Sequence, residues 1–290
     1  MIERPDFIVS EDEARLFPIL AETSKEKRVA SIFLAVMTQI PVLAEEVLSS
    51  VGVRVGKRTR VRAFTEVVLK DKVEDGCRPD GLLIIDTGRT QWSALIEAKI
   101  GRNELTSEQV SKYAELAKAN GIDAVITISN EFVARADHSP VSISKMLLRK
   151  VDLFHWSWSW LATVCEILEY QEAVTDTEQG YLLGQLNHFL AHPATGVERF
   201  TQMTASWKDV TQAVSNDEAL RKTAPEVEAV AASWVAEERD LCLHMSSHIG
   251  QEVAAKVERK LSDDPASRLK AMAEALATRH SLSSVIRVPN

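Results

Sequence analysis

Apolar and polar residues alternate in two different periods over the first 158 residues of the chain. Short apolar runs typical of strands occupy 60–70, 82–86, 91–97, 123–129 and 151–158. Helix-period spacing covers 26–51, where Pro41 is expected to start or kink a second segment, and also 106–120, which Gly121 ends. This order predicts an α/β fold with a central mixed sheet flanked by helices, in which strand 123–129 runs parallel to the strand before it because a helix connects them.

The pattern changes at residue 159, where alanine-rich sequence with a period of 3.6 replaces the strand-like runs. We therefore expect three parts: a lead-in over 1–25 containing one short helix capped near Ser10, a core over 26–158, and an α-helical region over 159–290. The expected helices of the last part are 160–170, 179–192, 227–243, 246–261 and 265–279.

The stretch 78–99 reads as a β-hairpin with its turn around Gly88. If the turn is symmetric, Asp86 pairs with Gln91, and Asp80 falls opposite Glu97 on the same face of the sheet. Lys99 lies two residues beyond Glu97, so period-2 alternation places it on that face as well. Two acids and a lysine are thus expected to converge at one end of an otherwise apolar sheet.

Charges in an apolar sheet must be paired or must bind metal. One interpretation is a buried ion pair that joins Lys99 to Glu97 or Asp80. The other is a divalent-cation site, because two carboxylates, a main-chain carbonyl such as that of Ala98, and waters suit Mg²⁺, with Mn²⁺ as a substitute. Lys99 would then orient the attacking water or stabilise negative charge on a phosphate.

These residues also resemble a known family. The R-P-D triplet at 78–80 followed by E-A-K at 97–99 resembles the signature of the PD-(D/E)XK nuclease superfamily. The run Q-V-S-K-Y at 109–113 resembles the Q-x-x-x-Y element of its RecB and lambda-exonuclease branch. The resemblance covers roughly residues 40–130, under half of the chain. It implies a restriction-endonuclease-like core and metal-dependent cleavage of phosphodiester bonds in DNA.

The resemblance also implies roles for single residues. Asp80 and Glu97 would bind the metal, and Lys99 would act on the attacking hydroxide or the phosphate. Gln109 and Tyr113 would buttress the site or the substrate backbone. A simpler explanation exists for this last pair, because Gln109 follows Thr106 at capping-box spacing and Tyr113 fits a core position one turn later.

A further acid is expected to complete the metal shell. Glu66 interrupts the first predicted strand, and the family often carries a glutamate there, so we rank it first. Glu46, on the first core helix, is the alternative, although it also fits an ordinary solvated helix face.

Charge adds a second candidate surface. The net charge of the chain is −8, which excludes a uniformly basic nucleic-acid binder. Within this acidic chain the segment 52–62 contains five cations and no acid, and it immediately precedes the acidic motif. It is either a phosphate-contacting arm beside the site or a basic strand edge that resists aggregation. The five residues are Arg54, Lys57, Arg58, Arg60 and Arg62.

The cysteines, apolar runs, tryptophans and histidines argue against several other kinds of site and location. The three cysteines have no metal-type spacing, and with no targeting signal they fit a reducing cytoplasm. No apolar run reaches membrane-spanning length. Alternating tryptophans at 156, 158 and 160 fit a core junction better than base stacking. Histidine pairs at 188/192 and 244/248 lack the acid of a zinc motif, so they are expected to be exposed helix residues.

The sequence therefore predicts a Mg²⁺-dependent deoxyribonuclease in restriction, repair or defence against mobile DNA. The alternative is a nuclease-like DNA-binding or assembly protein whose cleavage is absent or regulated. The helical region exceeds what one small sheet needs for cover, so we expect it to mediate a homodimer.

Overall fold

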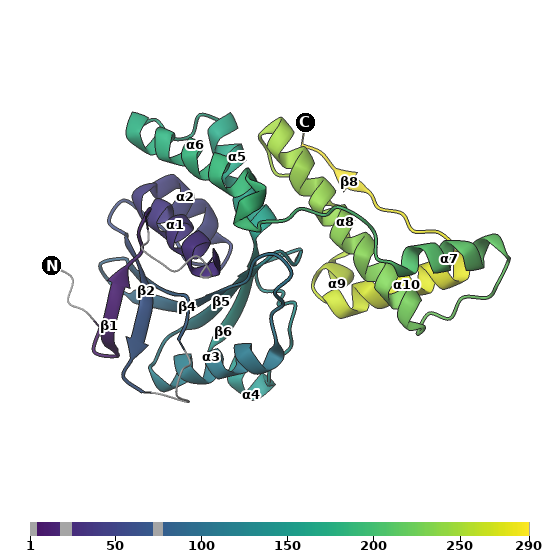
Figure 1. Cartoon of the computed structure of the whole chain (residues 1–290), viewed down its shortest axis with the longest axis horizontal. Coiled ribbons are helices and arrows are strands. Elements are labelled where there is room, and N and C mark those ends of the chain that lie inside the picture. The colour runs from purple at the N-terminus through teal and green to yellow at the C-terminus, as the bar shows by residue number, and fades with distance from the viewer. Residues whose placement is uncertain (1–4, 18–24, 72–77, 290) are drawn as a thin grey trace. The chain divides into compact units, whose positions relative to one another are not determined.

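The computed structural model describes residues 5–17, 25–71 and 78–289, and it divides into two compact units, Met1–Glu198 and Arg199–Asn290 (Figure 1). The first unit is built on a mixed sheet flanked by helices, and the second is mainly helical. The predicted α/β class, with a helical region after it, is therefore confirmed.

One six-stranded sheet forms the centre of the first unit, and its strands lie in chain order. The first four strands pair antiparallel, and the last three pair parallel, so the fourth strand belongs to both halves. The strands are β1 (Ile8–Glu13), β2 (Arg60–Leu69), β3 (Gly81–Asp86), β4 (Gln91–Ala98), β5 (Ala124–Ser129) and β6 (Asp152–Ser157).

The hairpin of β3 and β4 has the predicted register. Asp86 pairs with Gln91 at the turn, and Gly81 pairs with Ile96 at the other end. The turn closes because Thr87 donates its amide to the carbonyl of Thr90 and Gly88 adopts a left-handed φ of 80°. Continuing the register by one residue places Asp80 opposite Glu97.

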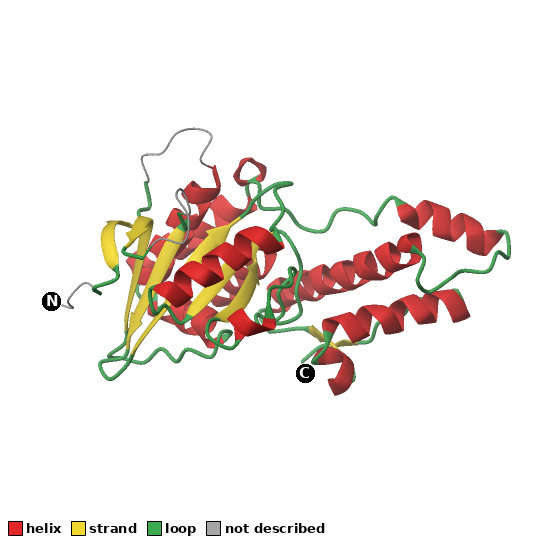
Figure 2. Cartoon of the chain, turned by 90° about the horizontal axis from the view of Figure 1, so that it is seen from below, coloured by secondary structure: helices red, strands yellow, loops and turns green. Residues whose placement is uncertain are grey.

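Helices cover both faces of the sheet, as Figure 2 shows for the face beneath α3. The helices α1 (Lys25–Gln39), α2 (Pro41–Ser49), α5 (Trp158–Tyr170) and α6 (Thr177–Ala191) pack on one face. The opposite face is covered by α3 (Ser107–Ala119) and the short α4 (Lys145–Leu148). β4 contributes to both cores, because Ile96 faces the first set of helices and Leu95 faces α3.

The N-terminal part differs from the prediction. The segment after Ser10 was expected to cap a short helix, but Ile8–Glu13 forms strand β1, which pairs antiparallel with β2. The prediction was wrong because pairing with a distant strand outweighs local capping chemistry. Residues 18–24, within the predicted lead-in, and 72–77, within the predicted polar turn before the hairpin, lie outside the described residues, as does Cys77.

Two of the predicted C-terminal helices belong to the first unit. α5 and α6 pack against the sheet face that α1 and α2 cover, with Leu161, Leu183 and Leu186 fully buried there. The compact unit consequently extends to Glu198, beyond residue 158, where we expected the core to end. The alternating tryptophans are core residues as predicted, since Trp156 and Trp158 are buried and Trp160 is half-buried.

The second unit has its own small core between α7 (Ser206–Ser215), α8 (Pro225–Ile249) and α10 (Pro265–Arg279). α8 is one continuous helix over the predicted segment 227–243 and the start of the predicted segment 246–261, and it ends before Gly250, which adopts a left-handed φ of 67°. The prediction of a helix over 246–261 was therefore wrong beyond Ile249, because Gly250 ends α8 and residues 254–255 form a short strand. The remaining elements are η1 (Pro193–Thr195) in the first unit and β7 (Ala254–Ala255), α9 (Arg259–Ser262) and β8 (Ile286–Arg287) in the second.

No single helix in the described part of the chain is long and apolar enough to cross a membrane. The pair α1 and α2 would pass by length and composition together, but it bends by 113°, and its apolar residues lie in the core.

Candidate functional site

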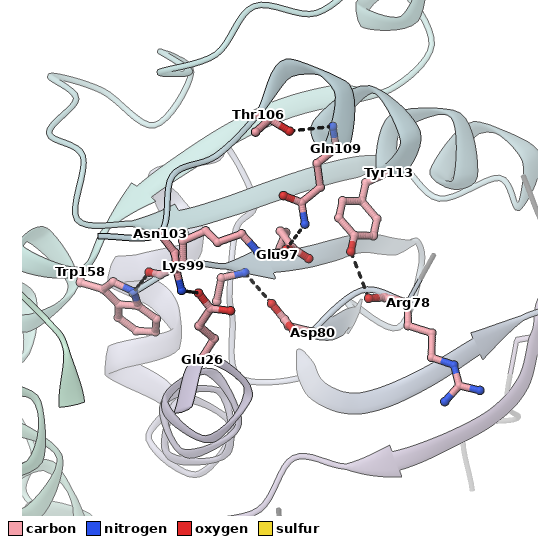
Figure 3. A network of polar contacts seen from close by, with 11 residues as sticks. Glu26, Arg78, Asp80, Glu97, Lys99, Asn103, Thr106, Gln109, Tyr113 and Trp158 are labelled. Atoms are coloured by element: carbon pink, nitrogen blue, oxygen red, sulfur yellow. Dashed lines mark hydrogen bonds and ion pairs between the residues drawn. The ribbon is translucent and has the colours of Figure 1, made fainter. Parts of the chain in front are cut away.

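The candidate site lies at the C-terminal end of the central strand β4. The first turns of α1 and α3 lie at the same end of the sheet (Figure 3). The hairpin brings Asp80 and Glu97 to this edge, and Lys99 follows directly after β4. Glu97 and Lys99 alternate with Ile96 and Ala98 of the opposite core, so they share the face covered by α3. The predicted convergence of two acids and one lysine is confirmed.

Both acids are buried. Asp80 is 7% exposed and Glu97 is 3% exposed, and the amide of Ala98 donates to Asp80 Oδ2 at 2.9 Å. Burial, and then the neighbouring charge of Glu97, raise the pKa of Asp80 from 3.8 to about 7. Burial also raises the pKa of Glu97, although the hydrogen bond and charge of Lys99 work against the rise. The two carboxyl groups therefore resist ionising together without a cation between them.

The two oxygens of Glu97 have different surroundings. Lys99 Nζ donates to Oε1 at 2.5 Å, and Gln109 Nε2 donates to the same oxygen at 2.6 Å. Oε2 is buried and has no hydrogen-bond partner among the described residues. A buried carboxylate oxygen left without a partner is costly, so this atom marks a position that a ligand would fill.

Lys99 is held as a cation. Burial alone would lower its pKa, but the hydrogen bond and charge of Glu97 outweigh burial, and the pKa of Lys99 is raised. Its side chain is 14% exposed, so the ammonium group lies at the boundary between the core and solvent. This contact alone would also fit the ion-pair interpretation of the sequence.

The helix α3 supplies the other predicted residues. Thr106 caps the helix by accepting the Gln109 amide at 3.2 Å, as predicted, while the side chain of Gln109 turns to Glu97. Capping and the site contact therefore use different atoms of Gln109, and one does not exclude the other. Tyr113 donates its hydroxyl to the carbonyl of Arg78 at 3.1 Å, and it is near enough to Glu97 to lower the pKa of that carboxyl group.

The residues present fit a small divalent cation. The described ranges hold no group of three or more histidine, cysteine, aspartate or glutamate side chains set to bind metal, so protein ligands at the site would be fewer. Asp80 and Glu97 offer one carboxylate oxygen each beyond their present contacts. The Ala98 amide points to Asp80, and the carbonyl of the same strand residue points the same way. Two carboxylates, one carbonyl and waters form an all-oxygen set of the kind that Mg²⁺ prefers.

Sequence reasoning missed Glu26, a half-buried residue in the first turn of α1. Its charge raises the pKa of Asp80, and Asn103 Nδ2, two residues after Gly101, donates to its Oε1 at 2.8 Å. Figure 3 shows it facing Lys99 and Asp80 from below the sheet edge. The only available signal was its position at the start of the first predicted helix.

Glu46, the candidate on the following helix, is exposed on α2, in keeping with a solvated face.

The structure does not bring Glu66 to the site. Its φ is 51°, and the pairing of β1 with β2 is irregular between Thr65 and Val68. Phe64 and Val67 both face the α3 core, so this β-bulge turns Glu66 to the opposite face, where Lys27 Nζ donates to its Oε1 at 2.6 Å. The prediction rested on the break in the apolar run and on the family resemblance, and neither shows to which face the side chain turns.

The basic segment 52–62 also lies away from the site. Arg60 pairs with Asp86 at the turn end of β3, whereas Asp80 precedes the other end. A six-residue strand spans about 20 Å, so most of the five cations lie roughly that far from the carboxylates. Arg62 is half-buried with its guanidinium 5.6 Å from the ring centroid of Phe64. The expectation of an arm beside the site was wrong because β2 enters the sheet from its far end; the other four cations are exposed.

A buried polar row continues from Glu97 across the parallel strands. Glu97 pairs with Thr127, and Thr127 pairs with His155. Burial lowers the pKa of His155 to about 4, so the ring is neutral at pH 7. Its Nε2 lies 3.1 Å from the carbonyl oxygen of Glu131, so Nε2 must carry the hydrogen of the neutral ring and donate to that oxygen. Nδ1 then has no hydrogen, and it accepts from Thr127 Oγ1 at 2.9 Å. This histidine therefore fixes backbone and is not poised to exchange protons.

The histidine pairs at 188/192 and 244/248 are exposed, as predicted, although His192 lies just after α6 and caps η1.

Comparison with known proteins finds no matching family model, no matching curated protein and no matching solved structure.

Proposed function

We propose that this chain is a Mg²⁺-dependent nuclease of the PD-(D/E)XK type that hydrolyses phosphodiester bonds in DNA. The observation that carries the proposal is the asymmetry of Glu97. Lys99 and Gln109 both donate to Oε1, while the buried Oε2 has no hydrogen-bond partner in the part of the chain that the structure describes. A plain ion pair needs no second acid, and it gives no reason to desolvate a carboxylate oxygen and leave it unused.

The proposed ligands are Asp80, Glu97 and the carbonyl of Ala98. When bound there, Mg²⁺ lowers the pKa of a coordinated water and offsets charge on the scissile phosphate. Lys99 then orients the attacking water and stabilises charge that develops on the phosphate. Gln109 fixes the rotamer of Glu97, and Tyr113 holds the backbone that leads into Asp80. Glu26, whose charge raises the pKa of Asp80, would orient a further water at the site.

Three substitutions test the proposal. Asp80→Asn and Glu97→Gln remove carboxylate repulsion, so each should raise the melting temperature of the metal-free protein while abolishing the stabilisation by Mn²⁺. Lys99→Ala keeps both acids, so Mn²⁺ should still stabilise it. All three should reduce Mg²⁺-dependent cleavage by at least about 100-fold, as when a positioned charge stabiliser is removed. Cleavage is measured on linear, nicked, circular and single-stranded DNA, with Mg²⁺ or with EDTA.

Asp86→Asn is the matched control, because Asp86 lies at the other end of β3, where its side chain accepts the Gly88 amide of its own turn. It should change neither metal response nor cleavage. A structural ion pair gives the reverse pattern: all three site variants destabilise the chain, and Mn²⁺ protects none of them, since each change strands a buried charge. Wild-type rates in Lys99→Ala would reject the nuclease assignment of this hairpin.

A nuclease-like DNA-binding protein with absent cleavage is the second candidate, favoured by the net charge of −8. It predicts binding without product on every substrate. A site that keeps a half-buried lysine between two acids argues against it, because an inactive protein has no need to retain that arrangement.

A further inference from the structure

The loop that follows Lys99 is fastened to a segment almost one hundred residues later in the chain. Gly101 donates its amide to the carbonyl of Gly196 at 2.8 Å. Asn130, directly after β5, joins the same two residues, because its Nδ2 donates to the carbonyls of Gly101 at 3.2 Å and Gly196 at 2.9 Å. Its Oδ1 accepts the Glu198 amide at 3.0 Å. One half-buried side chain therefore links three segments of the first unit.

The approach of the two backbones is close enough to require a glycine. Gly196 has a left-handed φ of 78°, and a Cβ atom there would meet the Gly101 amide nitrogen at 3.2 Å and Ile100 at 3.3 Å. A side chain at this position would push the two segments apart. We call the contact of Gly101, Asn130 and residues 196–198 the exit clamp, since Glu198 is the last residue of the first unit.

The clamped loop also supports the site at two points. The carbonyl of Lys99 accepts from Trp158 Nε1 at 2.9 Å, and its amide donates to Ile128 at 2.7 Å. Further along the loop, Asn103 donates to Glu26. The loop therefore begins at Lys99 and contacts Glu26 through Asn103, so its conformation bears on two charged groups of the site.

We propose that Asn130 is a positioning residue for the site, acting through Gly101 on Lys99 and Glu26, and that residues 196–198 form part of the site's framework. This inference rests on the nuclease proposed above. Asn130 touches neither substrate nor metal. Its effect is to hold the loop in one conformation, because three hydrogen bonds to backbone restrain a connection that would otherwise move. Misplacement of a reacting group by about 1 Å can cost about 100-fold in rate.

The chain contains a matched control for this role. Asn120, at the C-terminal end of α3, makes the same set of contacts: Nδ2 donates to the carbonyls of Asp71 at 2.8 Å and Leu116 at 2.9 Å, and Oδ1 accepts the Asp71 amide at 3.1 Å. It lies at the opposite end of α3 from Gln109. Loss of either asparagine removes three comparable bonds, but only Asn130 is joined to the site loop.

The experiment compares Asn130→Ala, Asn130→Asp and Asn120→Ala in the full chain, with kcat and KM for DNA cleavage measured at saturating Mg²⁺. We expect Asn130→Ala to lower kcat by about 10-fold to 100-fold with KM within about 2-fold of wild type. Asn130→Asp keeps the acceptor for Glu198 but loses both donated bonds, so it should be impaired as much as the alanine variant. Asn120→Ala should melt earlier by a similar margin and retain wild-type kcat.

Gly196→Ala approaches the same clamp from the other side. If both residues act through Gly101, the double variant Asn130→Ala/Gly196→Ala should lose no more activity than the more impaired of the two single variants. Mn²⁺ stabilisation should persist in every clamp variant, since the carboxylates are untouched.

The outcomes separate the two proposals. If wild type cleaves and Asn130→Ala matches Asn120→Ala in kcat, the positioning role is overturned and the nuclease stands. If both asparagine variants lose kcat in proportion to their loss of folded protein, the clamp is only structural, and the inference is again overturned. If wild type cleaves no substrate with Mg²⁺ or Mn²⁺, the nuclease proposal fails, and the inference falls with it.

Discussion

Asp80 carries the electrostatic strain of the site, because it is buried beside a second carboxylate and, among the described residues, its hydrogen-bond donor is the backbone amide of Ala98. Glu97, by contrast, receives two side-chain donors on one oxygen. Burial raises the pKa of both carboxyl groups, and that of Asp80 reaches about 7, so Asp80 still holds a proton part of the time at neutral pH. A metal ion would displace this proton, so pH should act on the metal-free protein through Asp80.

The pKa of Asp80 is raised from 3.8 to about 7, so the folded chain keeps a proton that the unfolded chain releases between these values. Its contribution to stability therefore falls as pH rises from about 4 to about 7. His155 has the opposite sign, because its pKa is lowered from 6.5 to about 4, and its contribution rises with pH over that range. The difference in melting temperature between Asp80→Asn and wild type isolates the first effect.

We expect that difference to grow from pH 5 to about pH 7 in EDTA and then to level off, and to shrink or reverse with Mn²⁺, which favours the charged carboxylates. Melting curves at matched ionic strength measure it. A difference that is constant with pH would show that Asp80 ionises normally in the folded chain.

Acidic residues near the site were only partly predictable from the sequence. Asp80 and Glu97 followed from hairpin symmetry, because a two-stranded register depends on few residues. Glu66 was chosen from the family resemblance and an interrupted apolar run, and the bulge that turns its side chain away leaves no local mark in the sequence. Glu26 was missed because its contact with Asn103 joins residues 77 positions apart, and sequence periodicity carries no information about such packing.

Among the elements, α3 combines two functions in one turn. Thr106→Ala should cost about 1 kcal/mol of stability by removing the cap, and it should leave kcat unchanged. Gln109→Ala keeps the capped amide, so stability should change little, while the freed Glu97 rotamer should lower kcat by about 10-fold or more. Denaturant unfolding and cleavage assays on both variants separate the roles. Equal loss of activity in both would mean that Gln109 matters only as a helix residue.

Strand β2 carries the basic segment to the end of the sheet opposite the site. Exchanging Arg58 and Arg60 for glutamate should weaken DNA binding on all sequences and flatten its salt dependence, because fewer counterions are released. Since the cations lie roughly 20 Å from the carboxylates, KM should rise while kcat for bound DNA stays near wild type. Binding titrations at several salt concentrations measure both effects.

Lys118→Glu with Lys150→Glu is the control, since both lysines are exposed and the change in net charge is the same. If the arginine pair and this lysine pair weaken binding equally, only the overall charge matters, and DNA contacts the protein elsewhere.

At the scale of the whole molecule, the α/β class, the strand order around the hairpin and most helices were accessible from hydrophobic periodicity. The extent of the first unit was not, because α5 and α6 read as helices in sequence while only packing against α1 and α2 assigns them to the sheet. Likewise, the period-3.6 pattern of residues 246–261 predicted a helix there, whereas Gly250 ends α8 near the start of that segment.

The helical second unit is where we expect self-association, as a two-fold dimer that would let two sites cut both strands. Exposed apolar side chains on this unit, including Leu241 and Val285, are available for such a contact. Light scattering across the working concentration range should give twice the chain mass. A monomer at every concentration would defeat this prediction, and it would leave the chemistry of the first unit unaffected.

The contacts that build the site differ greatly in sequence separation, and we expect this difference to decide the order in which they form during folding. Asp80 and the Ala98 amide are 18 residues apart, whereas Asn130 and Gly196 are 66 apart. Closing a longer loop costs more entropy, and during synthesis residues 196–198 emerge long after the hairpin. Pulse-labelling hydrogen exchange should detect protection of the hairpin before that of Gly101. A nascent chain would thus possess its metal-binding acids well before it could use them, and cleavage would begin only once the first unit is complete.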